Sequence, residues 1–266
     1  MNRGGSVPKR TRLIAVVALV LLSWTGSPAQ PAAPARAPLV SPRPLADVSV
    51  QFQEWRGKIV TYEEPLLTWS GDLHEIPGKS GTKGYLYPKE QAFLVPPEAE
   101  SEPDLGVALN KTLEAYHQQT TGTRFQILTS KWGYHIVPLQ VHDDHGALVP
   151  ARSLLGAQIY VPSKERTLLE HLGAFGIAVR AATGTNLEAV PFPPAQGSQQ
   201  ARPERFAWGT EPKVARDALI DLLSRSAIKL SWRLYCQASS QPDARFCVLN
   251  LATFGPVSTN SPQRLQ

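Results

Sequence analysis

The feature that most constrains the fold is a pair of cysteines, Cys236 and Cys247, in two neighbouring strand-like segments. Residues 230–237 and 244–252 are rich in aromatic and branched side chains. Residues 239–243 between them have the composition of a turn. A β-hairpin centred on this turn places the two cysteines directly opposite each other.

The same register predicts which face of the hairpin is buried. It pairs Leu234 with Leu249 and Trp232 with Leu251, and these side chains share one face with the cysteines. We expect that face to be buried, because it gathers the large apolar residues. The opposite face is expected to carry Arg233, Gln237 and Asn250.

Cys236 and Cys247 are the only cysteines in the chain. In an oxidising compartment we expect them to close into a structural cross-strand disulfide. Two alternatives stay open, a pair of buried free thiols and a redox-active pair. The spacing is not the C-x-x-C of thiol oxidoreductases, which favours the structural disulfide.

The first 29 residues have the three-part order of a secretion signal. Basic residues at positions 3–12 precede an apolar run at residues 13–22, and small residues follow at 27–29. The run is too short for a membrane span of about 20 residues. We therefore expect cleavage after Ala29 and a periplasmic or secreted bacterial protein, with an uncleaved N-terminal anchor as the alternative.

Export also changes the charge argument. The chain has 27 Lys+Arg and 22 Asp+Glu, a formal net charge of +5. Four of the basic residues and none of the acidic ones lie in residues 1–29, which leaves 23 basic against 22 acidic residues. This near-neutral balance argues against a nucleic-acid partner. We expect an unidentified cell-envelope protein or glycan as partner, and no transmembrane segment after signal removal.

Composition and periodicity divide the rest of the chain. Residues 30–45 are rich in Pro and Ala and predict an extended linker. Residues 46–97 predict a small β unit, which begins with the alternation of Val48, Val50 and Phe52.

A helix and a β-hairpin are predicted over 98–156, two strand–helix–strand units over 157–256 and a tail over 257–266. Within residues 157–256, the segment 192–204 is rich in Pro and Gln and predicts a long surface loop.

Three segments have apolar residues at helical spacing, and each precedes a predicted strand. The first runs from Leu105 to Tyr116. The second has Ser163 as its predicted N-cap and ends at Thr183-Gly184, and the third has Thr210 as N-cap with Pro212 in its first turn. The predicted buried faces of the last two consist of Leu168, Leu169, Leu172, Phe175 and Val179, and of Val214, Ala215, Ala218, Leu219, Leu222 and Leu223.

Each amphipathic helix needs a sheet against which to bury its apolar face. The pattern therefore predicts an α+β fold. In it, amphipathic helices pack on small mixed or antiparallel sheets, helix–strand units repeat, and a disulfide closes the C-terminal β-hairpin.

Three features carry a family resemblance: Ile159-Tyr160-Val161-Pro162, Thr183-Gly184 after a helix, and the A-x-x-A-L-x-x-L-L pattern of Ala215–Leu223. With them, the segment from Ile159 onward resembles the short N-terminal domain shared by secretins and TonB-dependent receptors. That domain consists of two strand–helix–strand units. The resemblance covers about 40% of the chain. It implies a binding or docking module.

The most conspicuous ionisable cluster is His142-Asp143-Asp144-His145, with His135 upstream. Imidazole and carboxylate groups suit zinc, so a metal-assisted hydrolase using His142, Asp144 and His145 is the alternative function. The same residues suit a hairpin turn, and His135 and His142 should face opposite sides of a strand. We favour the turn, and expect no metal and no cofactor.

Two other patterns have a chemical and a structural interpretation. Gly78-Lys79-Ser80 is similar to the end of a phosphate-binding loop, but no helix pattern follows, so it predicts a flexible turn. Glu63-Glu64 is a carboxylate pair of the kind used in glycoside hydrolysis. Adjacent strand residues point to opposite faces, so we expect one side chain at a solvated edge and one bonded to the backbone.

Trp55, Trp69, Trp132 and Trp208 lie near predicted turns or strand ends. Such aromatic residues form binding platforms, although more often they cover the edges of a core. Neither G-x-S-x-G nor H-E-x-x-H occurs in the chain, and we nominate no catalytic residue. The sequence therefore favours an exported, non-enzymatic binding or assembly module of the cell envelope, which meets its partner through a sheet edge or exposed aromatic residues.

Overall fold

The computed structural model describes residues 37–77, 85–190, 204–226, 229–238 and 245–254. Several predictions from the sequence lie outside these residues. They concern the signal peptide, the Gly78-Lys79-Ser80 turn, nearly all of the 192–204 loop and the 257–266 tail.

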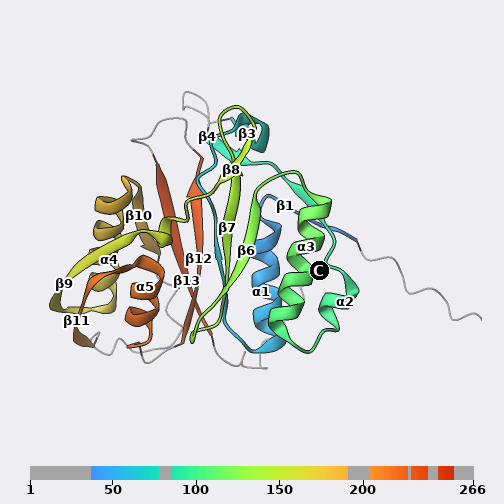
Figure 1. Cartoon of the computed structure of the whole chain (residues 1–266). Helices are drawn as coiled ribbons and strands as arrows, with labels where there is room; N and C mark the ends of the chain where they lie inside the picture. Colours follow the sequence, from blue (N-terminus) through green and yellow to red (C-terminus); the bar gives the residue numbers. More distant parts are fainter. Residues whose placement is uncertain (1–36, 78–84, 191–203, 227–228, 239–244, 255–266) are drawn as a thin grey trace, which may run out of the picture. The chain divides into compact units, whose positions relative to one another are not determined.

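A mixed sheet of seven strands forms the centre of the fold (Figure 1). The strand order is β10-β13-β12-β2-β7-β6, and β8 pairs with β7. β2 is parallel to both of its neighbours and β10 is parallel to β13, whereas the remaining pairs are antiparallel. The bounds are β2 Val60–Glu63, β6 Arg124–Thr129, β7 Tyr134–His142, β8 Leu148–Pro150, β10 Asn186–Val190, β12 Leu230–Gln237 and β13 Phe246–Thr253.

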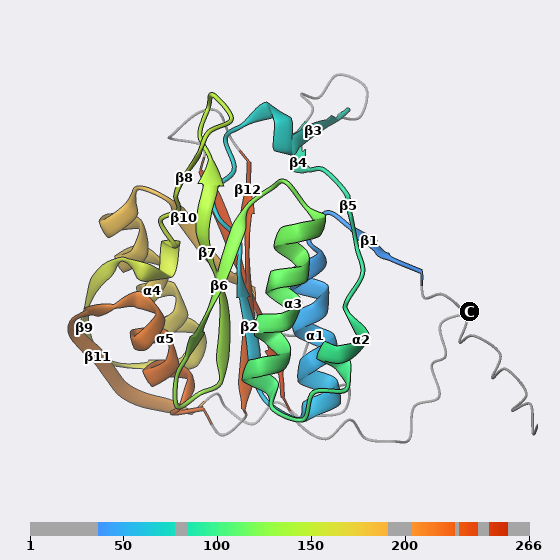
Figure 2. The same cartoon turned by 45° about the vertical axis from the view of Figure 1, so that its right-hand side comes forward.

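Helices cover both faces of this sheet (Figures 1 and 2). One face carries α1 (Pro44–Arg56) and α3 (Leu105–Gln119), with the short α2 (Pro97–Glu100) beside α3. The other face carries α4 (Leu168–Thr183) and α5 (Ala215–Leu223). The fold is therefore α+β, as the sequence predicts.

Small elements complete the two layers. β9 (Gln158–Thr167) pairs with β11 (Arg205–Val214) in an antiparallel ribbon that contacts α4. Two further antiparallel pairs join β1 (Leu39–Ser41) to β5 (Gln91–Phe93) and β3 (Leu73–Ile76) to β4 (Tyr85–Pro88). The 3-10 turns η1 and η2 cover Ser70–Asp72 and Leu154–Gly156.

The C-terminal hairpin has the predicted register. Cys236 lies opposite Cys247, with the pairs Leu234–Leu249 and Trp232–Leu251 beyond them. The two cysteines form a disulfide. All six side chains are buried, as expected from the clustering of apolar residues on one face.

The opposite face of β12 is not a solvated surface, although Gln237 on it is exposed. Arg233 and Tyr235 are half-buried beneath the α1 layer, and Arg233 Nε donates to Ser49 Oγ of α1 at 3.4 Å. The reason is the position of β12, which lies between β13 and β2 and is covered by helices on both sides. The C-terminal hairpin is thus a central part of the sheet.

The chain before β2 differs from the prediction of a linker and a strand. Residues 39–41 form β1, and α1 replaces the predicted strand at Val48–Phe52. Leu45, Val48 and Phe52 are spaced for one helix face, and all three are buried. Pro44 suits the first helical turn, and Gly57, with φ 58°, ends the helix in the left-handed region.

The starts of α4 and α5 also differ from the prediction. Ser163 and Thr210 are not N-caps, because they and Pro212 belong to the β9/β11 ribbon. Thr167 caps α4 instead: its hydroxyl accepts from the Glu170 N–H, while the Glu170 carboxylate accepts from the Thr167 N–H. Strand pairing extends each strand up to the helix and overrides the upstream cap signals.

The buried faces of α4 and α5 largely match the prediction. Leu172, Phe175 and Val179 are buried, but Leu169 is 56% exposed. Gly184 closes α4 in the left-handed region, and β10 follows.

The region therefore has the order β9-α4-β10 and β11-α5-β12, which is the predicted strand–helix–strand order twice. Membership of the secretin and TonB short-domain family stays a prediction.

Candidate functional site

The site lies where β2 leaves the sheet. Glu64 N–H still donates to Leu234 O of β12 at 3.0 Å, but Pro65 has no N–H with which to continue the pairing. Gln140 of β7 pairs with Arg124 of β6 and also with Pro150 of β8. β8 therefore occupies the side of β7 that β2 has left.

A groove borders this point. Its larger cavity, about 650 Å³, is lined by Leu66 after β2, by the β8–β9 connection from Arg152 to Gln158, by the end of α4 and by Arg245 before β13. A second cavity of about 330 Å³ shares Leu66, Arg152 and Arg245 with it and extends to the β7–β8 turn. These volumes are in the range of small-molecule sites. We call the two adjoining cavities the β2-end groove.

A buried ion pair fixes the wall of this groove. Arg216, in the first turn of α5, donates to Glu63 through Nε at 2.6 Å and Nη2 at 2.8 Å, and Glu63 is 0% exposed. The Ser153 hydroxyl donates to Glu63 and accepts from Arg216 Nη2 at 3.0 Å. Because Ser153 lines the groove, this network anchors the β8–β9 connection to the end of β2.

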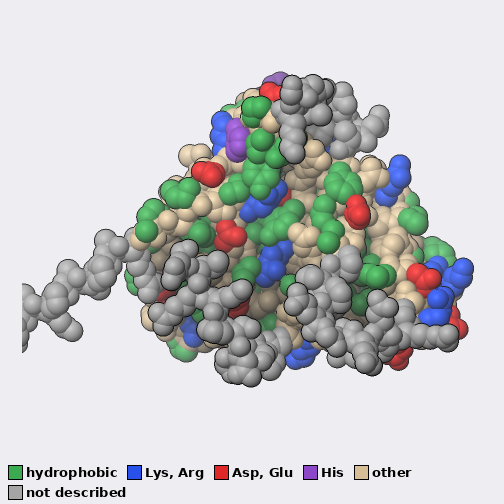
Figure 3. Space-filling model, turned by 180° about the vertical axis from the view of Figure 1, so that it is seen from behind, with side chains coloured by type: hydrophobic (Ala, Val, Ile, Leu, Met, Phe, Trp, Pro, Cys, Tyr) green, Lys and Arg blue, Asp and Glu red, His purple; other side chains and the backbone are tan. Residues whose placement is uncertain are grey.

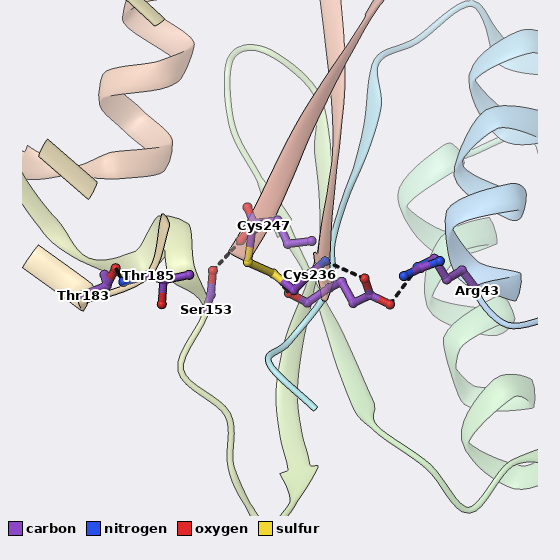
Figure 4. Close-up of a disulfide and its surroundings, with 8 residues drawn as sticks. Arg43, Ser153, Thr183, Thr185, Cys236 and Cys247 are labelled. Atoms are coloured by element: carbon purple, nitrogen blue, oxygen red, sulfur yellow. Dashed lines mark hydrogen bonds and ion pairs between the residues drawn. A yellow bond between two sulfur atoms is a disulfide. The ribbon is translucent and has the colours of Figure 1, made fainter. Parts of the chain in front are cut away.

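Glu64 directly follows β2, lies on the other face of the sheet and has its own arginine. Arg43 Nε, just before α1, donates to Glu64 at 2.8 Å, and the Cys236 N–H donates to the same carboxylate at 2.7 Å (Figure 4). The Arg43 guanidinium also lies 4.7 Å and 4.9 Å from the ring centres of Tyr87 and Tyr235. Burial raises the pKa of Glu64, while Arg43 and the Cys236 N–H oppose that shift.

The prediction for the Glu63-Glu64 pair is therefore only half right. Glu64 does accept from the backbone, but neither side chain lies at a solvated edge, since Glu63 is 0% and Glu64 3% exposed. Each carboxylate has a guanidinium partner on its own side of the sheet. They cannot flank one glycosidic bond, so the pair is structural.

Two arginines, Arg152 and Arg245, bring positive charge to the groove. In the part of the chain that the structure describes, the side chains of Arg152 and Arg245 make no ion pair and no hydrogen bond. Arg245 Nε is buried and unpartnered, and so is Thr185 Oγ1, in a residue that is 1% exposed. Figure 4 shows Ser153, Thr183 and Thr185 on one side of the disulfide and Arg43 on the other.

The surface of the molecule also carries charge next to apolar groups. In Figure 3, Lys and Arg side chains lie in the middle of the face seen from behind, between hydrophobic side chains and single acidic ones. Exposed apolar residues are thus interleaved with positive charge on this face.

The His142–His145 segment forms the predicted turn between β7 and β8. The Asp143 carboxylate accepts from the His145 and Ala147 N–H groups, each at 2.9 Å. His142 is buried, with Nδ1 2.9 Å from Asp72 Oδ2, whereas Asp144 and His145 are exposed.

Among the residues with described positions, no group of three His, Cys, Asp or Glu side chains is placed to hold a metal ion.

His135 is a buried structural residue of β7. Its Nδ1 lies 2.8 Å from Thr61 Oγ1 and its Nε2 lies 2.7 Å from Ser130 Oγ. The ring stacks on Trp232, with centres 5.3 Å apart. Burial, together with the charge of Arg216, lowers the pKa of His135 to about 4. The imidazole is therefore neutral at physiological pH.

Two of the four nominated tryptophans, Trp132 and Trp208, pack in or against the core. Trp208 is 1% exposed and donates to Asp221, and Trp132 donates to Leu230 O. Trp69 lies against the ring of His142, with centres 4.5 Å apart. Only Trp55, at 52% exposure, is open to a partner. Of the four nominated tryptophans, Trp55 alone is exposed.

The groove residues carry no local sequence signal. Glu63 lies 90 residues from Ser153 and 153 residues from Arg216. Arg152, Thr185 and Arg245 likewise come from separate segments that only the folded chain brings together.

The Glu63→Leu substitution is expected to lower the free energy of unfolding by about 3–5 kcal/mol, because it leaves the Arg216 guanidinium buried without a counter-charge. The double variant Glu63→Leu/Arg216→Met should recover most of that loss. Urea denaturation measures both, with the exposed Glu211→Leu as control. Equal destabilisation of the single and double variants would contradict a buried ion pair.

Stability is expected to fall as the pH drops from 6.5 to 4. The unfolded chain protonates His135 near its ordinary pKa of 6.5, whereas the folded protein does so only near 4. The contribution of His135 is therefore complete above pH 6.5 and decreases below it, by up to about 1.4 kcal/mol per pH unit. Denaturation across this range should show a shallower slope for His135→Gln. The exposed His145→Gln should keep the wild-type slope. If His135→Gln keeps the wild-type slope as well, His135 does not have this role.

The comparisons with known proteins found no relative of this chain. No protein-family model, no curated protein and no solved structure matches the chain. No helix within the described ranges is long and apolar enough to cross a bilayer.

Proposed function

We propose that this chain is exported across a bacterial membrane and acts as a non-enzymatic binding module of the cell envelope. The observation that carries the proposal is the β2-end groove. It adjoins the end of a central strand, it is large enough for a small ligand, and its lining includes polar atoms without partners. The partner is a component of the envelope, a protein or a glycan.

The support for export is independent of the groove. The leader of the sequence has the order of a secretion signal, and Cys236 and Cys247 are joined in a disulfide. The predicted strand–helix–strand order of residues 158–237 supports a docking module in the same compartment.

A metal-assisted hydrolase has no observation in its favour. His142 is buried and its Nδ1 contacts Asp72, while Asp144 and His145 are exposed on the turn. We therefore place the binding surface at the groove rather than at the histidine turn or at Trp55.

Mass spectrometry of the protein isolated from a bacterial host tests export. The expected product starts at Gln30, after removal of residues 1–29, and has no free thiol. An intact chain starting at Met1 in the cytoplasm, with both cysteines alkylated by a thiol reagent, would sink the proposal.

Two tryptophan substitutions on α4 test the groove. Ala182 lines the larger cavity and its neighbour Ala181 does not, and both are exposed. The Ala182→Trp variant fills the groove, so it should lose the envelope component that the immobilised wild-type protein captures. Ala181→Trp should retain it.

Both variants must show the circular dichroism of the wild type, so that a loss of capture reports on the groove and not on folding. Equal capture by the two variants, or no enrichment by the wild type over a bare matrix, would contradict groove binding.

A further inference from the structure

We propose that the β2-end groove binds the oxyanion of an acidic saccharide, a carboxylate or a phosphate, between Arg152 and Arg245. This inference rests on the proposed function of the groove as a ligand site and names the chemistry of the ligand.

The charge of the groove is the first argument. Arg152 and Arg245 line both cavities, so they lie where the cavities meet. The described lining of the larger cavity includes no Asp or Glu, and the acidic side chains Asp143 and Asp144 line only the smaller one. A guanidinium presents paired N–H donors that match a carboxylate or phosphate. Among the described lining residues, an anion in the larger cavity therefore meets two cations and no carboxylate.

The unpartnered polar atoms give a second, independent argument. Arg245 Nε and Thr185 Oγ1 are buried without a hydrogen-bond partner, and Thr185 is 1% exposed. A buried polar group without a partner is unfavourable, and native proteins rarely keep one without a reason. The oxygens of a bound oxyanion would accept from the guanidinium N–H and the threonine O–H groups.

Both arginines are held by anchored segments. Arg152 precedes Ser153, which the buried Glu63–Arg216 pair holds in place. The Arg245 carbonyl accepts from the Asn186 N–H at 3.1 Å, and Cys247, two residues on, is in the disulfide. Such anchoring reduces the ordering cost of binding.

The remaining lining suits a ligand rich in hydroxyl groups. Gln158 provides an uncharged donor and acceptor, while Leu66, Leu154 and Ala157 provide apolar contacts. Sugars present this combination of hydroxyl groups and C–H faces. An acidic saccharide therefore fits both the charged centre and the neutral ends.

Isothermal titration calorimetry with three probes tests the proposal: digalacturonic acid, glucose 1-phosphate and the neutral maltose. We expect at least one anionic probe to bind and maltose not to bind, with an affinity that falls as the salt concentration rises. The stronger of the two anions identifies the oxyanion as a carboxylate or a phosphate.

Arginine variants locate the binding. Arg152→Gln and Arg245→Gln should each lower the affinity for the anionic probe about tenfold, since each removes a charge-assisted hydrogen bond. Arg180→Gln, an exposed residue of α4 outside the described groove lining, makes the same charge change and should bind like the wild type. Thr185→Val keeps both arginine charges, and it should also lower the affinity for the anionic probe.

The inference is overturned if neither anion binds at roughly millimolar concentration. It is also overturned if maltose binds equally well, or if both arginine variants bind the anionic probe like the wild type. The proposed function has a separate test, the capture of an envelope component by Ala182→Trp. If Ala182→Trp still abolishes envelope capture while no anion binds, the groove is a ligand site of different chemistry.

Discussion

The fold depends on two neighbouring carboxylates at the end of β2 that are buried on opposite faces of the sheet. Glu63 pairs with Arg216 in the first turn of α5, and Glu64 pairs with Arg43 just before α1. A buried charge is tolerated only with its counter-charge, so each pair fixes the start of one helix against the end of β2. Through these two contacts a single dipeptide ties both helical layers to the central sheet.

The same point of the sheet creates the groove. β2 is parallel to β7 and β12, and it stops where Pro65 removes the next donor. Ligand sites of α/β sheets commonly lie beyond the carboxyl ends of such strands, because the chain must turn away and leave a crevice. Here the β8–β9 connection and the end of α4 border that crevice, and the buried Glu63–Arg216 pair supports one wall.

The amino-acid sequence predicts structure where its signal is local and periodic. The alternation in residues 230–252 was long enough to set the register of β12 and β13, and the spacing of Leu172, Phe175 and Val179 set the face of α4. Three alternating residues in 48–52 were too few to tell a strand from a helix.

Distance along the chain explains what the sequence could not reveal. The partners of the carboxylates lie 21 and 153 residues away, and the groove draws on four segments. No window of sequence contains these contacts, so neither the burial of Glu63 nor the site beside it was predictable.

The central position of β12 has a consequence for how the chain acquires its structure. β12 begins only at residue 230 of 266, yet it joins β13 and β10 to β2 and the strands beyond it. During synthesis, β2, β6 and β7 must therefore wait for almost the whole polypeptide before the sheet is complete. Contacts between such distant segments form slowly, and until then the apolar faces of α4 and α5 lack the strands that bury them. A chain with this order of assembly stays incompletely folded for most of its synthesis.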